Sequence, residues 1–122
     1  MFLYALILIW AIIIFVLSSI QNPLNLGSSI IFSIAFHLVE YIVLAFLVAI
    51  AFHRTNRFSN LIFLVGFPLL LVALYAASDE IHQSYVDGRQ ASVKDFYIDV
   101  FGASLGIFCA RFCIFLRSRL AR

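Results

Sequence analysis

Most of the acidic residues of this chain share one short interval with a histidine, a glutamine and an arginine. The residues are Asp79, Glu80, His82, Gln83, Arg89, Asp95 and Asp99. A carboxylate or an imidazole can act as a general base when burial and neighbouring charges tune its protonation. A guanidinium can hold a phosphate or a carboxylate through two parallel hydrogen bonds. The interval therefore carries the groups needed for acid–base chemistry on an anionic substrate.

A second polar pair, His37 and Glu40, interrupts a long apolar run. The two residues are three positions apart, so they share one face of a helix. A carboxyl group near the middle of a bilayer costs about 2.5 to 3.5 kcal/mol on insertion scales, and such groups face the protein interior. We therefore expect the pair to face an interior pocket. The simpler alternative is an interhelical hydrogen bond that only fixes packing.

Helical spacing predicts one pocket lined by both groups of residues. We assign candidate catalytic roles to Glu40, Asp79, Glu80 and His82. We assign ligand-binding roles to His37, Gln83, Arg89, Asp95 and Asp99. A divalent metal held by His37, Glu40, Asp79 and His82 is a weaker alternative, because the chain has no H-E-x-x-H motif. The residues identify no cofactor.

Structural roles compete with these assignments. Asp95 is a candidate N-cap of a helix, and Asp79 is a candidate turn residue at a helix end. Arg89 is a candidate ion-pair partner of Asp79 or Glu80. A capping role and a functional role are compatible.

The elements that must position these residues are membrane helices. Of the 122 residues, 65% are hydrophobic and only 11% are charged, against roughly 25% charged residues in soluble domains. Apolar runs predict a single domain over 1–122, with spans at about 2–20, 30–52, 61–78 and 95–116. The fold class is all-α, a four-helix membrane bundle. Pro68 predicts a kink in the third span.

Basic residues predict the orientation. Arg54, Arg57 and the arginines from Arg111 to Arg122 belong to one face, and only Arg89 and Lys94 belong to the other. Basic residues near helix ends stay on the cytoplasmic side. Both termini should therefore be cytoplasmic, and the pocket should open to the outer face. No Lys or Arg precedes residue 54, so we expect the first run to be a helix rather than a cleaved signal.

The last span carries two pairs of small residues. Gly102 and Gly106 form a small-xxx-small surface that lets another helix approach closely. Cys109 and Cys113 lie one turn apart and are expected to be apolar residues that face lipid or another helix.

A long motif extends from the third predicted span into the fourth and reads Ser78-Asp79-Glu80-x-x-Gln83-x-Tyr85-Val86-x-Gly88-Arg89-x-x-Ser92-x-x-Asp95-x-x-x-Asp99-x-x-Gly102-Ala103-x-x-Gly106. This motif resembles the signature of the VanZ-like membrane proteins. Upstream, 15–19 with Pro23 resembles the end of that family's first helix, and 37–44 resembles its second. The family often has Asp-Lys where this chain has Ser33 and Ile34. The resemblance implies four helices and an association with low-level resistance to the glycopeptide teicoplanin.

Three functions are open at this stage. The first is a cell-membrane, multi-pass protein whose pocket binds or modifies a lipid-linked or phosphate-bearing ligand of the cell envelope. The second is a small proton- or solute-coupled transporter, which at 13.8 kDa would have to form a homo-oligomer. The third is a structural subunit of a membrane complex. The bilayer is the expected partner in each case, and no nucleic-acid partner is expected.

Overall fold

The computed structural model describes residues 1–20, 30–55, 60–89 and 91–121. These residues form four α-helices, namely α1 (Phe2–Ser18), α2 (Ile30–Thr55), α3 (Phe67–Gln83) and α4 (Val93–Leu120), and a π-helical segment, η1 (Ile62–Gly66), that leads into α3. No strand occurs within the described ranges, so the predicted all-α class is confirmed. Arg57, Arg122 and Pro23, which entered the predictions above, lie outside the described residues.

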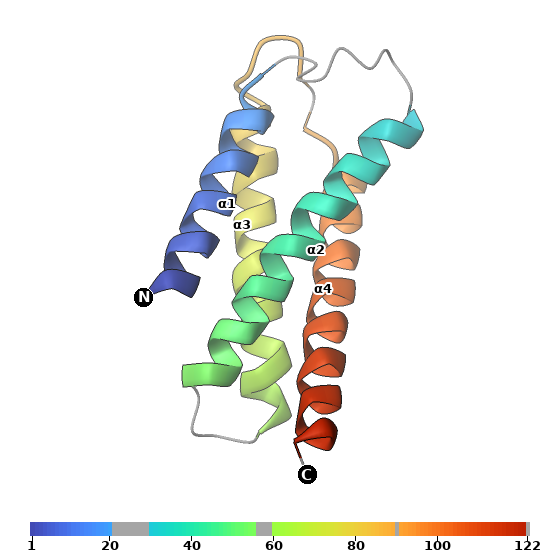
Figure 1. The fold of residues 1–122 in the computed structure, drawn as a ribbon. Helices are drawn as coiled ribbons and strands as arrows, with labels where there is room; N and C mark the ends of the chain where they lie inside the picture. The colour runs from blue at the N-terminus through green and yellow to red at the C-terminus, as the bar shows by residue number, and fades with distance from the viewer. Residues whose placement is uncertain (21–29, 56–59, 90, 122) are drawn as a thin grey trace.

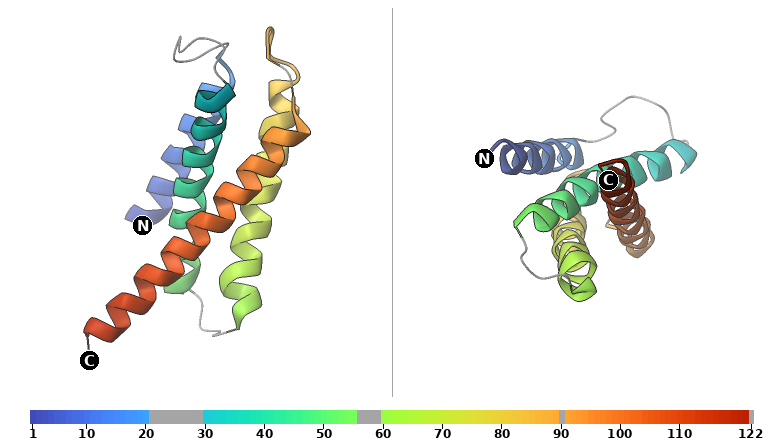
Figure 2. Two further views of the ribbon diagram at one scale, coloured as in Figure 1. Left: turned by 90° about the vertical axis from the view of Figure 1, so that its right-hand side faces the viewer. Right: turned by 60° about the horizontal axis from the view of Figure 1, so that its bottom comes forward.

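Successive helices run in opposite directions along the bundle (Figures 1 and 2). The end of α1, the start of α2, the end of α3 and the start of α4 therefore lie at one end of the molecule, called the α3–α4 end below. Both chain termini point away from it. This topology matches the prediction that the termini share a side, and the assignment of that side to the cytoplasm stays a prediction.

Three of the helices are long and apolar enough to cross a membrane: Ile31–Thr55, Ile62–Gln83 and Val93–Leu120. Helix α1 has 17 residues. At about 1.5 Å per residue it rises about 25 Å, which is less than the roughly 30 Å of a hydrocarbon core. The predicted four spans thus correspond to four helices, of which three meet the length of a membrane span.

The irregular segment of the third span lies immediately before Pro68. Proline has no backbone N–H, and its ring clashes with the carbonyl group one turn earlier in an α-helix. The π-helical segment Ile62–Gly66 widens the backbone at this place, and Pro68 occupies the first turn of α3. A π-helical turn therefore leads directly into α3 at this proline, and the kink predicted at Pro68 stays a prediction.

Helices α2 and α4 form the most extensive interface of the bundle. A side-chain carbon added at Gly102 would lie 3.0 Å from the carbonyl oxygen of Leu38, and one added at Gly106 would overlap the carbonyl group of Ile42. The two backbones therefore touch where the sequence has glycine. The close approach predicted from the small-residue pattern is confirmed.

The apolar core fills the middle of the bundle. Its largest fully buried side chains include Tyr41, Ile14 and Val72. Helix α1 is attached to this core by two hydrogen bonds, from Trp10 Nε1 to the carbonyl of Glu40 at 2.9 Å and from the Tyr75 hydroxyl to the carbonyl of Ala11 at 2.6 Å. The buried polar residues of the candidate site lie toward the α3–α4 end.

Candidate functional site

Helix α3 extends further than the apolar run suggests. It ends at Gln83, so Asp79, Glu80 and Gln83 are helical and buried rather than part of an external connection. Two contacts support the extra turn. The Gln83 amide donates to Asp79 Oδ2 at 2.9 Å, and the backbone N–H of Ser84 donates to the carbonyl of Glu80 at 3.2 Å. The helix thus continues beyond residue 78, where the predicted span ends, and the limit of the span itself stays a prediction.

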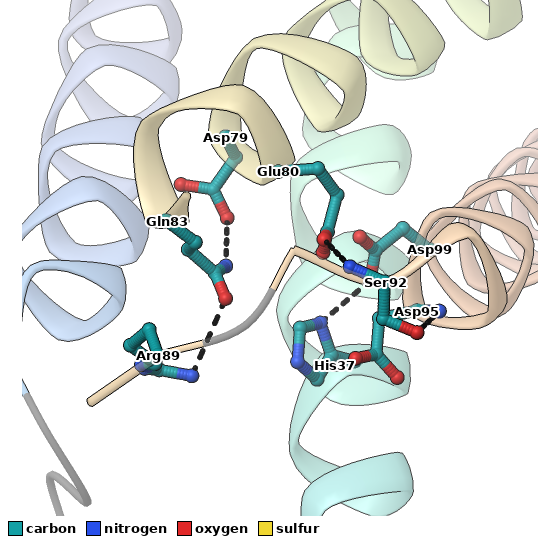
Figure 3. Close-up of polar contacts among 8 residues, drawn as sticks. All are labelled: His37, Asp79, Glu80, Gln83, Arg89, Ser92, Asp95 and Asp99. Carbon is teal, nitrogen blue, oxygen red and sulfur yellow. Dashed lines mark hydrogen bonds and ion pairs between the residues drawn. The ribbon is translucent and has the colours of Figure 1, made fainter. Parts of the chain in front are cut away.

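His37 and Asp99 join α2 to α4 at this end of the bundle. His37 Nδ1 lies 3.0 Å from Asp99 Oδ1, and both side chains are buried. Figure 3 shows this pair beside Glu80 of α3. Among the residues that the structure describes, no other side-chain ion pair occurs. The interhelical contact weighed for His37 thus exists, and its partner is Asp99.

Glu80 connects the end of α3 to the start of α4. Its Oε2 accepts a hydrogen bond from the backbone N–H of Ser92 at 2.8 Å (Figure 3). Ser92 is the N-cap of α4, and its hydroxyl accepts from the backbone N–H of Asp95 at 3.4 Å. The predicted cap at Asp95 was therefore wrong by three residues, and Asp95 lies in the first turn. The pattern Ser-x-x-Asp before an apolar run is a cap signature that identifies Ser92.

Asp79, Gln83 and Arg89 form a hydrogen-bonded chain (Figure 3), and Arg89 continues it to the end of α1. Arg89 Nη1 lies 3.4 Å from Gln83 Oε1, Nη2 donates to the carbonyl of Leu17 at 2.9 Å, and Nε donates to the carbonyl of Ile20 at 3.3 Å. A cation beside the carbonyl groups of the last turn stabilises a helix C-terminus. Arg89 makes no ion pair with Asp79 or Glu80.

His82 points away from the other candidate residues. Its Nε2 lies 2.9 Å from the hydroxyl of Ser19, and its ring stacks on Phe15 with the centroids 4.4 Å apart.

The structure brings His37, Glu80 and Asp99 together, with one ligand-type atom of each within 4.8 Å of the others. Of the four suggested metal ligands, only His37 belongs to this triple.

Several buried polar atoms of the site have no hydrogen-bond partner among the described residues. They are Glu40 Oε1, the Tyr41 hydroxyl, Asp79 Oδ1, Glu80 Oε1 and Asp99 Oδ2. Buried polar atoms in folded proteins nearly always have a partner, and an exception requires an explanation such as a bound group. Tyr41, Ser92 and Trp10 were absent from the predicted site, and only Ser92 has a recognisable signal in the sequence.

A cavity of about 360 Å³ adjoins this polar cluster. It lies between the end of α3 and the start of α4, and its lining is mainly apolar. The lining residues are Ala77, Glu80, Ile81, Ser84, Ala91, Ser92, Val93 and Phe96. Of the nine residues predicted to line a common pocket, Glu80 alone borders this cavity.

The fold and the site define a small helical membrane protein with a buried cluster of carboxyl groups at one end. The chain matches the model of the VanZ/LLP1 family over residues 1–116, and it therefore belongs to that family. The resemblance drawn from the motif is confirmed. Neither the curated proteins nor the solved structures contain a match to this chain.

Proposed function

We propose that this protein binds a lipid-linked ligand of the cell envelope that bears a phosphate or carboxylate group. The apolar part of the ligand occupies the cavity between α3 and α4, and its polar end reaches the buried cluster. The proposal rests on Glu80, because this residue lines the cavity and also belongs to the triple with His37 and Asp99.

The size and the lining of the cavity support an amphiphilic ligand. Binding sites for small molecules have volumes of roughly 300 to 1,000 Å³ and combine an apolar lining with few polar groups. The cavity has about 360 Å³. Its polar residues are Glu80, Ser84 and Ser92, and Phe96 and Ile81 are among its apolar ones.

The family assignment supports a ligand in the envelope rather than in the cytoplasm. The motif resemblance implies an association with low-level teicoplanin resistance, and the predicted orientation places the α3–α4 end on the outer side of the membrane. General-base roles for Glu40, Asp79, Glu80 or His82 remain predictions from the sequence. Glu80 is the best placed of the four, because it alone of them borders the cavity.

Mass spectrometry of the lipids that co-purify with the protein tests the proposal. The variant Ala77→Phe fills the cavity without changing a residue of the polar cluster, so it should lose the co-purifying lipid-linked species. Ala5→Phe is the matched control, because Ala5 is exposed on α1. The control should retain the same lipids as the wild type.

Equal lipid profiles in the wild type, Ala77→Phe and Ala5→Phe would contradict the proposal. Such a result would favour a structural subunit. Flux of protons or solutes through liposomes that stops in Glu40→Gln would instead favour the transporter.

A further inference from the structure

We propose that His37, Glu80 and Asp99 form a binding site for one divalent transition-metal cation such as Zn²⁺. The three residues come from α2, α3 and α4, and one ligand-type atom of each lies within 4.8 Å of the others. The site therefore joins three helices at the α3–α4 end.

The donor set suits such a cation. It offers one imidazole nitrogen and two carboxylate oxygens, and both kinds of donor bind divalent metals in proteins. Zinc sites with three protein ligands and one open position hold those ligands at about 2.0 to 2.2 Å from the metal, so the donor atoms lie about 3.5 Å apart. The three donors now lie within 4.8 Å of one another, so they would have to move closer to bind one cation. If His37 Nδ1 and Asp99 Oδ1 both bind it, the proton that they share is released to solvent.

Two buried oxygen atoms of the triple point independently to a missing partner. Asp99 is 0% exposed and Glu80 is 7% exposed, yet Asp99 Oδ2 and Glu80 Oε1 have no hydrogen-bond partner in the described chain. Their other oxygens are used by His37 and by the backbone of Ser92. Each carboxylate thus has one position available for a ligand.

The charge balance leads to the same conclusion. The carboxyl groups of Glu40, Asp79, Glu80 and Asp99 are all buried at this end, and the only ion pair among the described residues is His37 with Asp99. Arg89 contacts Gln83 and two backbone carbonyls instead. Buried carboxyl groups in proteins are paired, coordinate metals or are neutralised by a proton. A divalent cation would neutralise the carboxylates that have no cationic side chain as partner among the described residues.

A cation here would also allow an anionic ligand to approach the acidic cluster. That consequence rests on the proposed function, whereas cation binding does not. The metal can be counted in detergent after lipid removal, so loss of lipid binding and loss of metal binding are separate results.

The test is elemental analysis of purified full-length protein that is first stripped with EDTA and then dialysed against Zn²⁺. The wild type should retain one Zn²⁺ per chain. Asp99→Asn and Glu80→Gln should each weaken Zn²⁺ binding by at least about tenfold, the lower range for changes around metal sites. His53→Gln and Asp87→Asn are matched controls, since both residues are exposed and outside the triple. They should bind as the wild type does.

X-ray absorption of the Zn²⁺-loaded wild type provides a second readout that needs no folded variant. It should show one imidazole and otherwise oxygen ligands. A sulfur shell would indicate binding by Cys109 and Cys113, and two imidazoles or a loss of Zn²⁺ in His82→Gln would indicate the ligand set suggested by the sequence. Any of these results, or no retained Zn²⁺, overturns the proposal.

Discussion

Helices α2 and α4 meet in two ways along one interface. In the middle of the bundle, Gly106 lies against the backbone of Ile42, and the contact leaves no space for a side chain. Toward the α3–α4 end, His37 and Asp99 join the same helices through buried polar atoms, and Asp99 Oδ2 has no partner in the described residues. The first region is therefore held by close packing, whereas the second contains a buried polar contact, which is costly to bury unless its groups are fully paired.

The largest effect is expected where the backbones touch. Gly106→Leu places a side chain on the carbonyl of Ile42, so α2 and α4 have to separate. Overpacking in a core costs about 1 to 3 kcal/mol where side chains can adjust, and a backbone clash offers less adjustment. We expect little or no folded protein by size-exclusion chromatography in detergent. Ser104→Leu, an exposed substitution on the same helix, should fold normally. Normal folding of Gly106→Leu would show that the close approach is dispensable.

The next effect concerns the His37–Asp99 pair and tests whether the polar end is retained for stability. Removal of one partner from a buried ion pair costs about 3 to 5 kcal/mol, whereas replacement of both by apolar residues is often neutral or stabilising. We expect His37→Leu and Asp99→Leu each to lower the thermal midpoint, and the double variant to recover most of it. The measurement is thermal unfolding in detergent. A double variant as unstable as the sum of the two single variants would show that the two residues are not coupled, which contradicts the expectation.

The sequence predicts correctly those features that depend on the composition and spacing within a single helix. The helical class, the antiparallel order and the glycine contact follow from apolar run length and from small-residue spacing. Some contacts between distant segments, however, could not be predicted. Nothing near His82 in the sequence indicates that it faces Ser19 and Phe15, which are more than sixty residues earlier. The same holds for Arg89, whose backbone partners Leu17 and Ile20 carry no side-chain signal.

A smaller effect is expected from Arg89, which the sequence assigned to ligand binding. Its guanidinium holds the end of α1 through Leu17 and Ile20. Hydrogen bonds from a charged donor contribute about 1.5 to 3 kcal/mol. We therefore expect Arg89→Ala to lower the thermal midpoint and to speed proteolysis at the end of α1. Arg89→Lys keeps the charge but lacks the planar set of N–H donors, so its thermal midpoint should lie between those of the wild type and Arg89→Ala. Unchanged stability together with loss of the co-purifying lipid would favour the ligand-binding role.

The smallest effect is expected at Ser92, where the polar end meets the start of α4. Ser92→Ala removes the hydroxyl that caps the helix, and N-cap replacements cost about 0.5 to 2 kcal/mol. The backbone N–H that donates to Glu80 is retained, so the cavity wall should keep its shape. A lower thermal midpoint with an unchanged lipid profile is the expected result. Ser118→Ala, an exposed change in the last turn of α4, is the control. Loss of lipid in Ser92→Ala alone would instead place the Ser92 hydroxyl against the ligand, and the polar end would then extend into the connection before α4.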